Sequence, residues 1–461
     1  MNLLFLTISI ALLGLVESKA QDNHLPETPF LGVEAYPLNA QIASSKGLTD
    51  TSGLLVVDLY PNNTAALMGI QAGDVLLSMQ GTSLTSIPAL REVLPATGDK
   101  VTVKLRRDGK TLRRKGRVYG RRFDLEESVS LRKMAVPFQD GLLRSFCFEP
   151  QEAGPQTATL FLLQGYPCQH DLHAPDWTSY HQLALRLARK GYRVYRMEKP
   201  GMGDSRNTPD CAAIDYETEL DAFRAGLSHL QSLEGVDPER IFLLGHSLGG
   251  LTAPLLAREA KVAGVMVYGI TYEPWLDYLE DNFRYQPVWF GVGAAQAEAR
   301  VQRMRPLLRT YLNDGLSPEA LIAEYPALDT LLYTQLDYDG QSQIMKRHWS
   351  FWPGVNRFNW PEVWSQTGAP MLAMYGDADI AALDGFSCQQ TVQALNQQNA
   401  GIATYHEFKD VNHHMVSIDR ETNLEILLTP QYRPYCKEHF SEKVVKYMHA
   451  WLQQQLLKVN G

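Results

Sequence analysis

The sequence has no excess of basic charge, no Cys-x-x-Cys pair and no apolar run long enough to cross a bilayer. With 51 acidic against 43 basic residues, the net charge is −8, so neither nucleic acid nor an anionic membrane is expected as the main partner. The five cysteines lack the short spacing of a zinc or redox site, so no metal is expected. At 461 residues, of which 45% are hydrophobic, the chain is globular and long enough for two or more domains.

The amino terminus differs from the rest of the chain. Leu3–Val16 is a 14-residue run of mainly apolar character, and small residues follow at Ser18 and Ala20, as signal peptidase requires. No Lys or Arg precedes this run. Residues 1–20 are therefore predicted to be a signal peptide rather than a buried helix, which implies a secreted or periplasmic protein without a membrane span after processing. Export would also permit disulfides.

Residues 27–120 have the pattern of a small β-rich domain. Alternating runs on either side of Asp108-Gly109 predict a β-hairpin. The run Pro61–Leu76 contains Gly69 and ends in Ala72-Gly73-Asp74-Val75-Leu76. Together these features resemble a PDZ domain of the kind found in bacterial periplasmic proteases.

The resemblance implies a groove that binds peptides. Its carboxylate-binding loop would consist of Phe30, Leu31, Gly32 and Val33. Backbone N–H groups of this loop would bind a protein C-terminus, and the peptide would add a strand to the sheet edge. Alternatively, the domain only packs against the rest of the chain. The eleven basic residues from Lys100 to Arg122 are interpreted as solvated faces of the hairpin, with an anionic surface partner as the alternative.

The second part of the chain, residues 125–461, is organised around Ile241–Gly250, in which apolar residues lead into Gly-His-Ser-Leu-Gly. A strand, a sharp turn and a helix in this order would expose the hydroxyl of Ser247 as a nucleophile. Gly245 and Gly249 lack a Cβ, so the strand and the helix can approach closely. Because such a pentapeptide also arises by chance, the rest of the chain has to show whether these residues form such a strand–turn–helix elbow.

Two predicted strands, Thr159–Leu163 and Tyr192–Met197, alternate with predicted helices before the predicted strand that leads into Ser247. This order implies a doubly wound, mostly parallel α/β sheet. The first strand ends in Gln164-Gly165-Tyr166, and the second is followed by Gly-Met-Gly-Asp-Ser at residues 201–205. These stretches resemble the esterase and serine-aminopeptidase-like members of the α/β-hydrolase superfamily. The resemblance implies that the backbone N–H groups of Tyr166 and Leu248 form the oxyanion hole.

An acid and a histidine follow in the chain order of this superfamily. The predicted strand Ala369–Tyr375 runs into Gly-Asp-Ala-Asp, and the family's acid, three residues after the glycine, corresponds to Asp379. Asp377 and Glu273 are the alternatives. The loop after the predicted strand Ala403–Phe408 contains two adjacent histidines. We choose His413 over His414 as the base, because the second position usually holds a small or packing residue.

A long insertion, about residues 271–366, holds six of the eight tryptophans and is predicted to form a helical lid. Its aromatic side chains either line an apolar acyl or aryl pocket or pack the lid helices together. Cys168 and Cys211 follow loops that belong at the carboxyl ends of adjacent strands, which predicts a disulfide between them. Cys388 with Cys436 is a second pairing to consider.

The resemblance and the order Ser247, Asp379, His413 predict a secreted or periplasmic serine hydrolase without a cofactor. Ser247 would attack the carbonyl of a small-molecule ester, His413 would take its proton, and water would release the acyl-enzyme. A carboxylesterase is the first hypothesis. The alternatives are a peptidase or peptide-amide hydrolase guided by the PDZ-like domain, and a non-catalytic peptide-binding protein.

Overall fold

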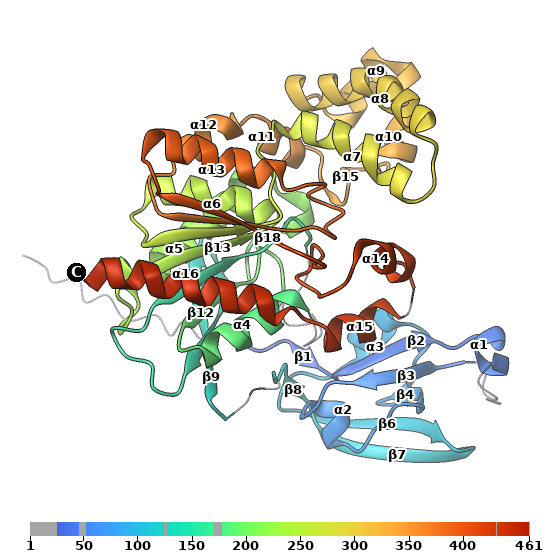
Figure 1. Ribbon diagram of the computed structural model, residues 1–461. Helices are drawn as coiled ribbons and strands as arrows, with labels where there is room; N and C mark the ends of the chain where they lie inside the picture. The colour runs from blue at the N-terminus through green and yellow to red at the C-terminus, as the bar shows by residue number, and fades with distance from the viewer. Residues whose placement is uncertain are drawn as a thin grey trace, which may run out of the picture.

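A computed structural model describes residues 25–45, 52–123, 125, 127–168, 178–429 and 431–460. Figure 1 shows a small β-rich unit at the lower right, followed by a larger α/β unit whose sheet is covered by helices. The predicted signal peptide, residues 1–20, lies outside the described residues. In the part of the chain that the structure describes, no helix combines the length and the apolarity needed to cross a membrane.

The small unit is built on a sheet with the strand order β2-β3-β4-β6-β7, while β5 pairs with β4 and β1 pairs with β8. The strands are β1 (Pro29–Phe30), β2 (Val33–Pro37), β3 (Leu54–Leu59), β4 (Val75–Met79), β5 (Thr82–Ser83), β6 (Lys100–Arg107), β7 (Lys110–Arg117) and β8 (Tyr119–Gly120). The helices are α1 (Ala40–Ser45), α2 (Thr64–Leu67) and α3 (Ile87–Val93). Asp108 and Gly109 join β6 to β7 with positive φ angles of 49° and 73°, so the predicted hairpin is confirmed.

Most basic residues of the β6–β7 hairpin face solvent, but two of them contradict the interpretation of the whole run as solvated. Arg107 donates from Nε to Oδ1 of the buried Asp74 at 2.6 Å. Arg121 is 2% exposed, and its guanidinium lies 4.2 Å from the ring centroid of Tyr60 and 5.1 Å from that of Phe123. Cation–π contacts of this kind favour burial of the charge beside aromatic faces, so the end of this basic run forms part of the junction between the two units.

The large unit contains an eight-stranded sheet with the order β18-β17-β14-β13-β11-β12-β10-β9. The strands are β9 (Val129–Phe138), β10 (Gly141–Pro150), β11 (Thr159–Leu163), β12 (Arg193–Met197), β13 (Ile241–His246), β14 (Gly264–Tyr268), β17 (Met371–Gly376) and β18 (Ala403–Phe408). The six strands from β18 to β12 are parallel, and β10 and β9 continue the sheet antiparallel. This arrangement confirms the predicted mostly parallel sheet.

Helices cover both faces of this sheet, as the continuous apolar runs of its strands require. The helices of the large unit outside the lid are α4 (Ser179–Arg189), η1 (Cys211–Ala213), α5 (Tyr216–Ser232), η2 (Pro238–Arg240), α6 (Leu248–Glu259), α13 (Phe386–Gln398), α14 (Arg420–Ile426), α15 (Tyr432–Glu438) and α16 (Glu442–Asn460). Side chains of α5, α6 and α13 pack on one face, and those of α4 and α16 pack on the other (Figure 1). Because β13 lies inside the sheet, its carboxyl end reaches the middle of the sheet edge.

The predicted lid is an insertion between β14 and β17, and its helices α7 to α10 lie at the upper right of Figure 1. Its elements are α7 (Trp275–Trp289), α8 (Ala294–Asp314), α9 (Pro318–Glu324), η3 (Pro326–Leu328), α10 (Asp329–Gln335), β15 (Gln343–Ile344), β16 (Arg347–His348), α11 (Phe351–Asn356) and α12 (Trp360–Ser365). Trp360 and Trp364 are fully buried and pack the lid against the core. Trp275 and Trp352 stack on each other with ring centroids 5.2 Å apart.

The segment before β1 is held to the large unit by a buried ion pair. Arg144 on β10 donates from Nε to Asp204 Oδ2 at 3.0 Å, and from Nη2 to the carbonyl of Leu25 at 2.8 Å. The backbone N–H of Thr28 donates to Asp204 Oδ1 at 2.6 Å. Asp204, which belongs to the predicted Gly-Met-Gly-Asp-Ser loop, therefore helps to connect the two units.

Candidate active site

Ser247 occupies a strained turn between β13 and α6. Its φ of 55° and ψ of −129° are rare for a residue with a side chain, and such strain persists where the surrounding structure requires it. A Cβ on Gly245 would lie 2.5 Å from the carbonyl oxygen of Gly249, and a Cβ on Gly249 would overlap the carbonyl of Leu163. Strand and helix can therefore cross beneath Ser247 only with glycines at both positions.

Asp379 and His413 meet at the same edge of the sheet, after β17 and β18. His413 Nδ1 lies 2.7 Å from Asp379 Oδ2, and Asp379 Oδ1 accepts bonds from the N–H groups of Ala381 and Ala382 at 2.7 and 2.9 Å. Burial raises the pKa of Asp379, but His413 and these backbone donors outweigh burial and leave that pKa below its ordinary value. When an ionised carboxylate accepts a hydrogen bond from Nδ1–H, Nε2 is the imidazole nitrogen that can accept a proton.

Close packing in this dyad requires a glycine on the neighbouring strand end. Gly269 has a φ of 63°, and a Cβ there would lie 2.9 Å from His413 Nδ1 and 3.0 Å from Asp379 Oδ2. Gly269 follows β14, so the dyad is supported from the strand next to β17. Any side chain at this position would push the histidine and the carboxylate apart.

The alternatives for the acid and the base make other contacts. Asp377 Oδ1 accepts from the backbone N–H of Asp410 at 2.6 Å and so ties the loops after β17 and β18 together. Glu273 is partly buried after β14, with a pKa raised by burial and by nearby carboxylates. His414 is fixed through its backbone, whose carbonyl accepts from Ser179 Oγ at 2.7 Å. Of the two histidines, it is His413 that contacts Asp379.

A third histidine, His246, also lies at the site, although its role was not predicted from the sequence. Its Nε2 lies 2.8 Å from the carbonyl of His413, and a carbonyl only accepts, so Nε2 carries the proton. Nδ1 then accepts from the hydroxyl of Tyr180 at 2.9 Å, and that oxygen accepts from the N–H of Gly165 at 2.8 Å. Burial, followed by the nearby His413 and His414, lowers the pKa of His246 well below its usual value, so this chain of bonds stays neutral and directional.

The predicted oxyanion residues lie beside Ser247. A Cβ on Gly165 would lie 3.2 Å from Ser247 Cβ, so this loop packs directly on the elbow. Tyr166 and Leu248 both border the cavity that contains Ser247. Leu248 is the first residue of α6, and the first N–H groups of a helix have no partner within it.

A cavity of about 800 Å³ opens over Ser247 and His413. The lid contributes apolar side chains to its wall, through Trp275, Tyr278, Leu279, Phe283 and Trp352. The lid tryptophans thus divide between the two predicted roles, since Trp275 and Trp352 line the cavity while Trp360 and Trp364 pack the lid. Within the described residues, no three His, Cys, Asp or Glu side chains are grouped so that they could hold a metal ion.

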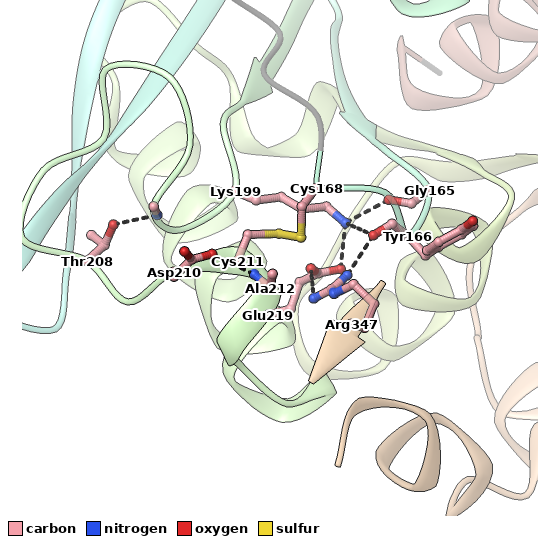
Figure 2. The surroundings of a disulfide bond; sticks show 11 residues. Gly165, Tyr166, Cys168, Lys199, Thr208, Asp210, Cys211, Ala212, Glu219 and Arg347 are labelled. Atoms are coloured by element: carbon pink, nitrogen blue, oxygen red, sulfur yellow. Dashed lines mark hydrogen bonds and ion pairs between the residues drawn. A yellow bond between two sulfur atoms is a disulfide. The ribbon is translucent and has the colours of Figure 1, made fainter. Parts of the chain in front are cut away.

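The structure contains the disulfide between Cys168 and Cys211 (Figure 2), with their Cα atoms 5.8 Å apart. It joins the loop after Tyr166 to the segment that leads into α5. Cys388 and Cys436 are separate buried thiols, so the second pairing considered is wrong. Cys388 lies on α13 and Cys436 on α15, and these helices pack in different apolar clusters.

Comparison with known proteins gives matches of two kinds. The model of the Alpha/beta hydrolase family matches residues 161–423. The esterase EstD of Thermotoga maritima is 23% identical over 304 residues, which cover 66% of this chain and 63% of EstD. The periplasmic serine endoprotease DegP of Escherichia coli strain K12 is 38% identical over 82 residues, which cover 17% of each protein. The chain thus spans about a sixth of the length of this endoprotease.

Solved structures also resemble the chain over most of its length. A crystal structure of proline iminopeptidase from Mycobacterium smegmatis covers 71% of this chain and 99% of its own, with 17% identity and a TM-score of 0.40. A putative dienelactone hydrolase from Klebsiella pneumoniae subsp. pneumoniae MGH 78578 covers 71% of this chain and 100% of its own, with 15% identity and a TM-score of 0.41.

Proposed function

The chain belongs to the alpha/beta hydrolase family and carries a PDZ-like domain on its amino-terminal side, and we propose that it is a serine carboxylesterase with Ser247, His413 and Asp379 as its triad. The observation that carries this proposal is the position of His413, which contacts the buried Asp379 and borders the same cavity as the strained Ser247. A nucleophile, a base and a carboxylate that orients the base are the groups that acyl transfer requires.

In the proposed mechanism, His413 Nε2 takes the proton of Ser247 Oγ while Oγ attacks the ester carbonyl. The backbone N–H groups of Tyr166 and Leu248 donate to the oxyanion, and Asp379 stabilises the imidazolium. The imidazolium then protonates the leaving alkoxide, and an acyl-enzyme remains on Ser247. Water, deprotonated by His413, attacks the acyl carbon, and Ser247 Oγ leaves and recovers its proton as the acid is released.

The shape of the cavity favours an ester with an apolar acyl or aryl group of moderate size. Its volume of about 800 Å³ falls within the range of small-molecule sites, which are mostly apolar with a few polar groups. The Tyr166 ring lies 5.4 Å from that of Trp352, which in turn stacks on Trp275. These three rings form a continuous aromatic wall that begins at the oxyanion loop.

A direct test compares p-nitrophenyl esters of increasing acyl length with aminoacyl and peptidyl p-nitroanilides. We expect the esters to be cleaved with the higher kcat/KM, and a fluorophosphonate probe to label Ser247, as shown by mass spectrometry of the labelled peptide. Anilides cleaved far better than every ester would replace this proposal by the peptidase. Absence of labelling in the folded protein would favour the non-catalytic binding protein.

Export is part of the proposal. It is supported by the predicted signal peptide at residues 1–20, by the relative of the amino-terminal part, whose name describes it as periplasmic, and by the Cys168–Cys211 disulfide, a bond that persists mainly in oxidising compartments. Amino-terminal sequencing of the protein recovered from the periplasm or medium should begin after Ala20. An intact Met1 in that fraction would contradict this.

We also propose a second binding function, for a peptide C-terminus on the PDZ-like domain. The observation that favours it is the position of β2 at the edge of its sheet, because an edge strand can pair with an added peptide strand. The predicted carboxylate loop of Phe30, Leu31, Gly32 and Val33 runs into this strand, which begins at Val33. Fluorescence anisotropy should show binding of a labelled apolar peptide with a free carboxylate and loss of binding on amidation. Equal binding of both forms would exclude the carboxylate loop as the site.

A further inference from the structure

Two cations and one carboxylate are buried directly behind the oxyanion loop. Lys199 follows β12, Glu219 lies on α5, and Arg347 begins β16 of the lid; their side chains are 1%, 3% and 0% exposed. Lys199 Nζ donates to Glu219 Oε1 at 2.9 Å, and Arg347 Nη2 donates to Glu219 Oε2 at 2.7 Å. Figure 2 shows the three side chains converging beside the disulfide. The mechanism above assigns no role to this Lys199–Glu219–Arg347 cluster.

Both cations also donate to the backbone of the oxyanion loop. Lys199 Nζ donates to the carbonyl of Gly165 at 2.7 Å and to that of Tyr166 at 3.1 Å. Arg347 Nη1 donates to the same Tyr166 carbonyl at 2.6 Å (Figure 2). Two successive carbonyls of one loop are therefore held by charged donors, which form stronger hydrogen bonds than neutral ones.

The geometry of the peptide bond connects these contacts to the reaction. The carbonyl of Gly165 and the N–H of Tyr166 belong to one planar trans peptide, so they point in opposite directions. A cation fixed on the Gly165 carbonyl thus determines the direction of the Tyr166 N–H, the donor assigned to the oxyanion. A hydrogen bond to the carbonyl also polarises the peptide and makes its N–H a better donor.

The carboxylate of Glu219 is suited to hold both cations in place. Burial raises the pKa of Glu219, but Arg347 and Lys199 together outweigh burial and lower that pKa below its ordinary value. Glu219 is therefore ionised at neutral pH. Arg347 is also fixed from the lid side, because its guanidinium lies 3.6 Å from the ring centroid of Phe351 on α11.

We propose that Lys199 and Arg347 are positioning residues for the oxyanion hole, with Glu219 holding both cations. Lys199 orients the Gly165–Tyr166 peptide directly through the Gly165 carbonyl, and Arg347 fixes the peptide that follows it through the Tyr166 carbonyl. This inference rests on the proposed serine hydrolase function. Because Lys199 comes from the core and Arg347 from the lid, the oxyanion donor is set by both parts of the large unit. A lid that loses its contact with Tyr166 would weaken transition-state binding as well as opening the cavity.

The first experiment removes one cation at a time. Lys199→Met leaves Arg347 paired with Glu219, and Arg347→Met leaves Lys199 paired with Glu219, so neither variant strands a buried charge. Since loss of a whole oxyanion donor costs about 10²- to 10³-fold in kcat, we expect misorientation of one to lower kcat for a p-nitrophenyl ester by about 10- to 100-fold with KM little changed. Arg347→Lys, which keeps a cation at Tyr166, should recover part of the loss.

A matched control separates positioning from general stability. Arg144→Met removes a cation from an equally buried ion pair, with Asp204, that lies outside the cavity. It should lower the midpoint of urea unfolding at least as much as Lys199→Met, because the buried Asp204 carboxylate loses its cation, while leaving kcat within about twofold of the wild type, as expected for a residue outside transition-state contacts. Equal losses of kcat in Arg144→Met and Lys199→Met would overturn the proposal.

A second readout measures the oxyanion directly. Ser247 Oγ attacks the carbonyl carbon of a trifluoromethyl ketone and forms a hemiketal. The Oγ proton passes to His413, and the negative charge remains on the former carbonyl oxygen. The matching methyl ketone serves as the ground-state probe. Lys199→Met should bind the trifluoromethyl ketone more weakly by about the same factor as its kcat falls. Its affinity for the methyl ketone should stay that of the wild type. Parallel loss for both ketones, or for neither, would contradict orientation of the oxyanion donor.

This design also separates the inference from the proposed function. If wild type and Ser247→Ala hydrolyse esters equally, the serine hydrolase proposal fails whatever Lys199→Met does. Urea unfolding first has to show that Lys199→Met and Arg347→Met are folded. If both then retain full kcat while Ser247→Ala is inactive, only the positioning role fails.

Discussion

Ser247→Ala is expected to lower kcat for a p-nitrophenyl ester by about 10⁶-fold, the scale seen when the nucleophile of a serine hydrolase triad is removed. Without Oγ no acyl-enzyme can form, and water bound at the same place lacks the alignment that the elbow gives to Ser247. Steady-state kinetics on protein freshly purified from a strain without background esterase would measure the loss. Labelling by the fluorophosphonate should disappear in parallel.

Ser179→Ala is the matched control for Ser247→Ala. Ser179 also borders the cavity, but its Oγ donates to the carbonyl of His414 at 2.7 Å rather than serving as a nucleophile. We expect its kcat to fall by less than about tenfold, as for the loss of one supporting hydrogen bond. Because alanine can replace serine at the elbow without added bulk, Ser247→Ala should unfold at the same urea concentration as the wild type or higher. If Ser247→Ala retained a kcat within tenfold of the wild type, the role of Ser247 as nucleophile would be disproved.

His413→Ala is expected to lower kcat by about as much as Ser247→Ala, because the residues of a triad act as one unit and their effects do not add. His414→Ala should lower it by less than about tenfold, since a structural side chain outside the triad contributes little to the barrier. The two residues are adjacent, yet it is the His413 imidazole that contacts Asp379, at 2.7 Å. Kinetics of both variants and of the double variant, with urea unfolding as a check of the fold, would measure the difference.

His413→Ala and His414→Ala are informative together because each removes one imidazole from the same loop. The double variant should be no slower than His413→Ala alone. If His414→Ala showed the larger loss, the base would have to be reassigned, and the contact between His413 and Asp379 would be structural. Equal losses in the two single variants would mean that the loop after β18, rather than one imidazole, determines activity.

Local patterns in the sequence sufficed for the parts of the site that depend on neighbours in the chain. The apolar run before Ser247 predicts β13, and the glycines at 245 and 249 predict the close crossing of β13 and α6 that the structure shows. The Cys168–Cys211 pairing could also be predicted, because parallel strands bring the loops at their carboxyl ends to one edge.

Long-range contacts account for what the sequence did not predict. Tyr180 and His246 are 66 residues apart, and Arg347 lies 181 residues from the Tyr166 carbonyl that it contacts. No pattern of composition or spacing marks such pairs. The burial of Arg121 beneath Tyr60 and Phe123 was missed for the same reason, because its aromatic partners become neighbours only when the two units pack together.

The sequence by itself therefore determined the order of strands and helices, the elbow with Ser247, and the loops from which an acid and a base would come. These features follow from apolar periodicity and glycine stereochemistry, which act over a few residues. Only the tertiary structure decided which histidine meets Asp379, which tryptophans line the cavity, and which charges lie behind the oxyanion loop. Those outcomes depend on how side chains from distant segments pack in three dimensions, where burial makes each polar contact strong and each missing partner costly.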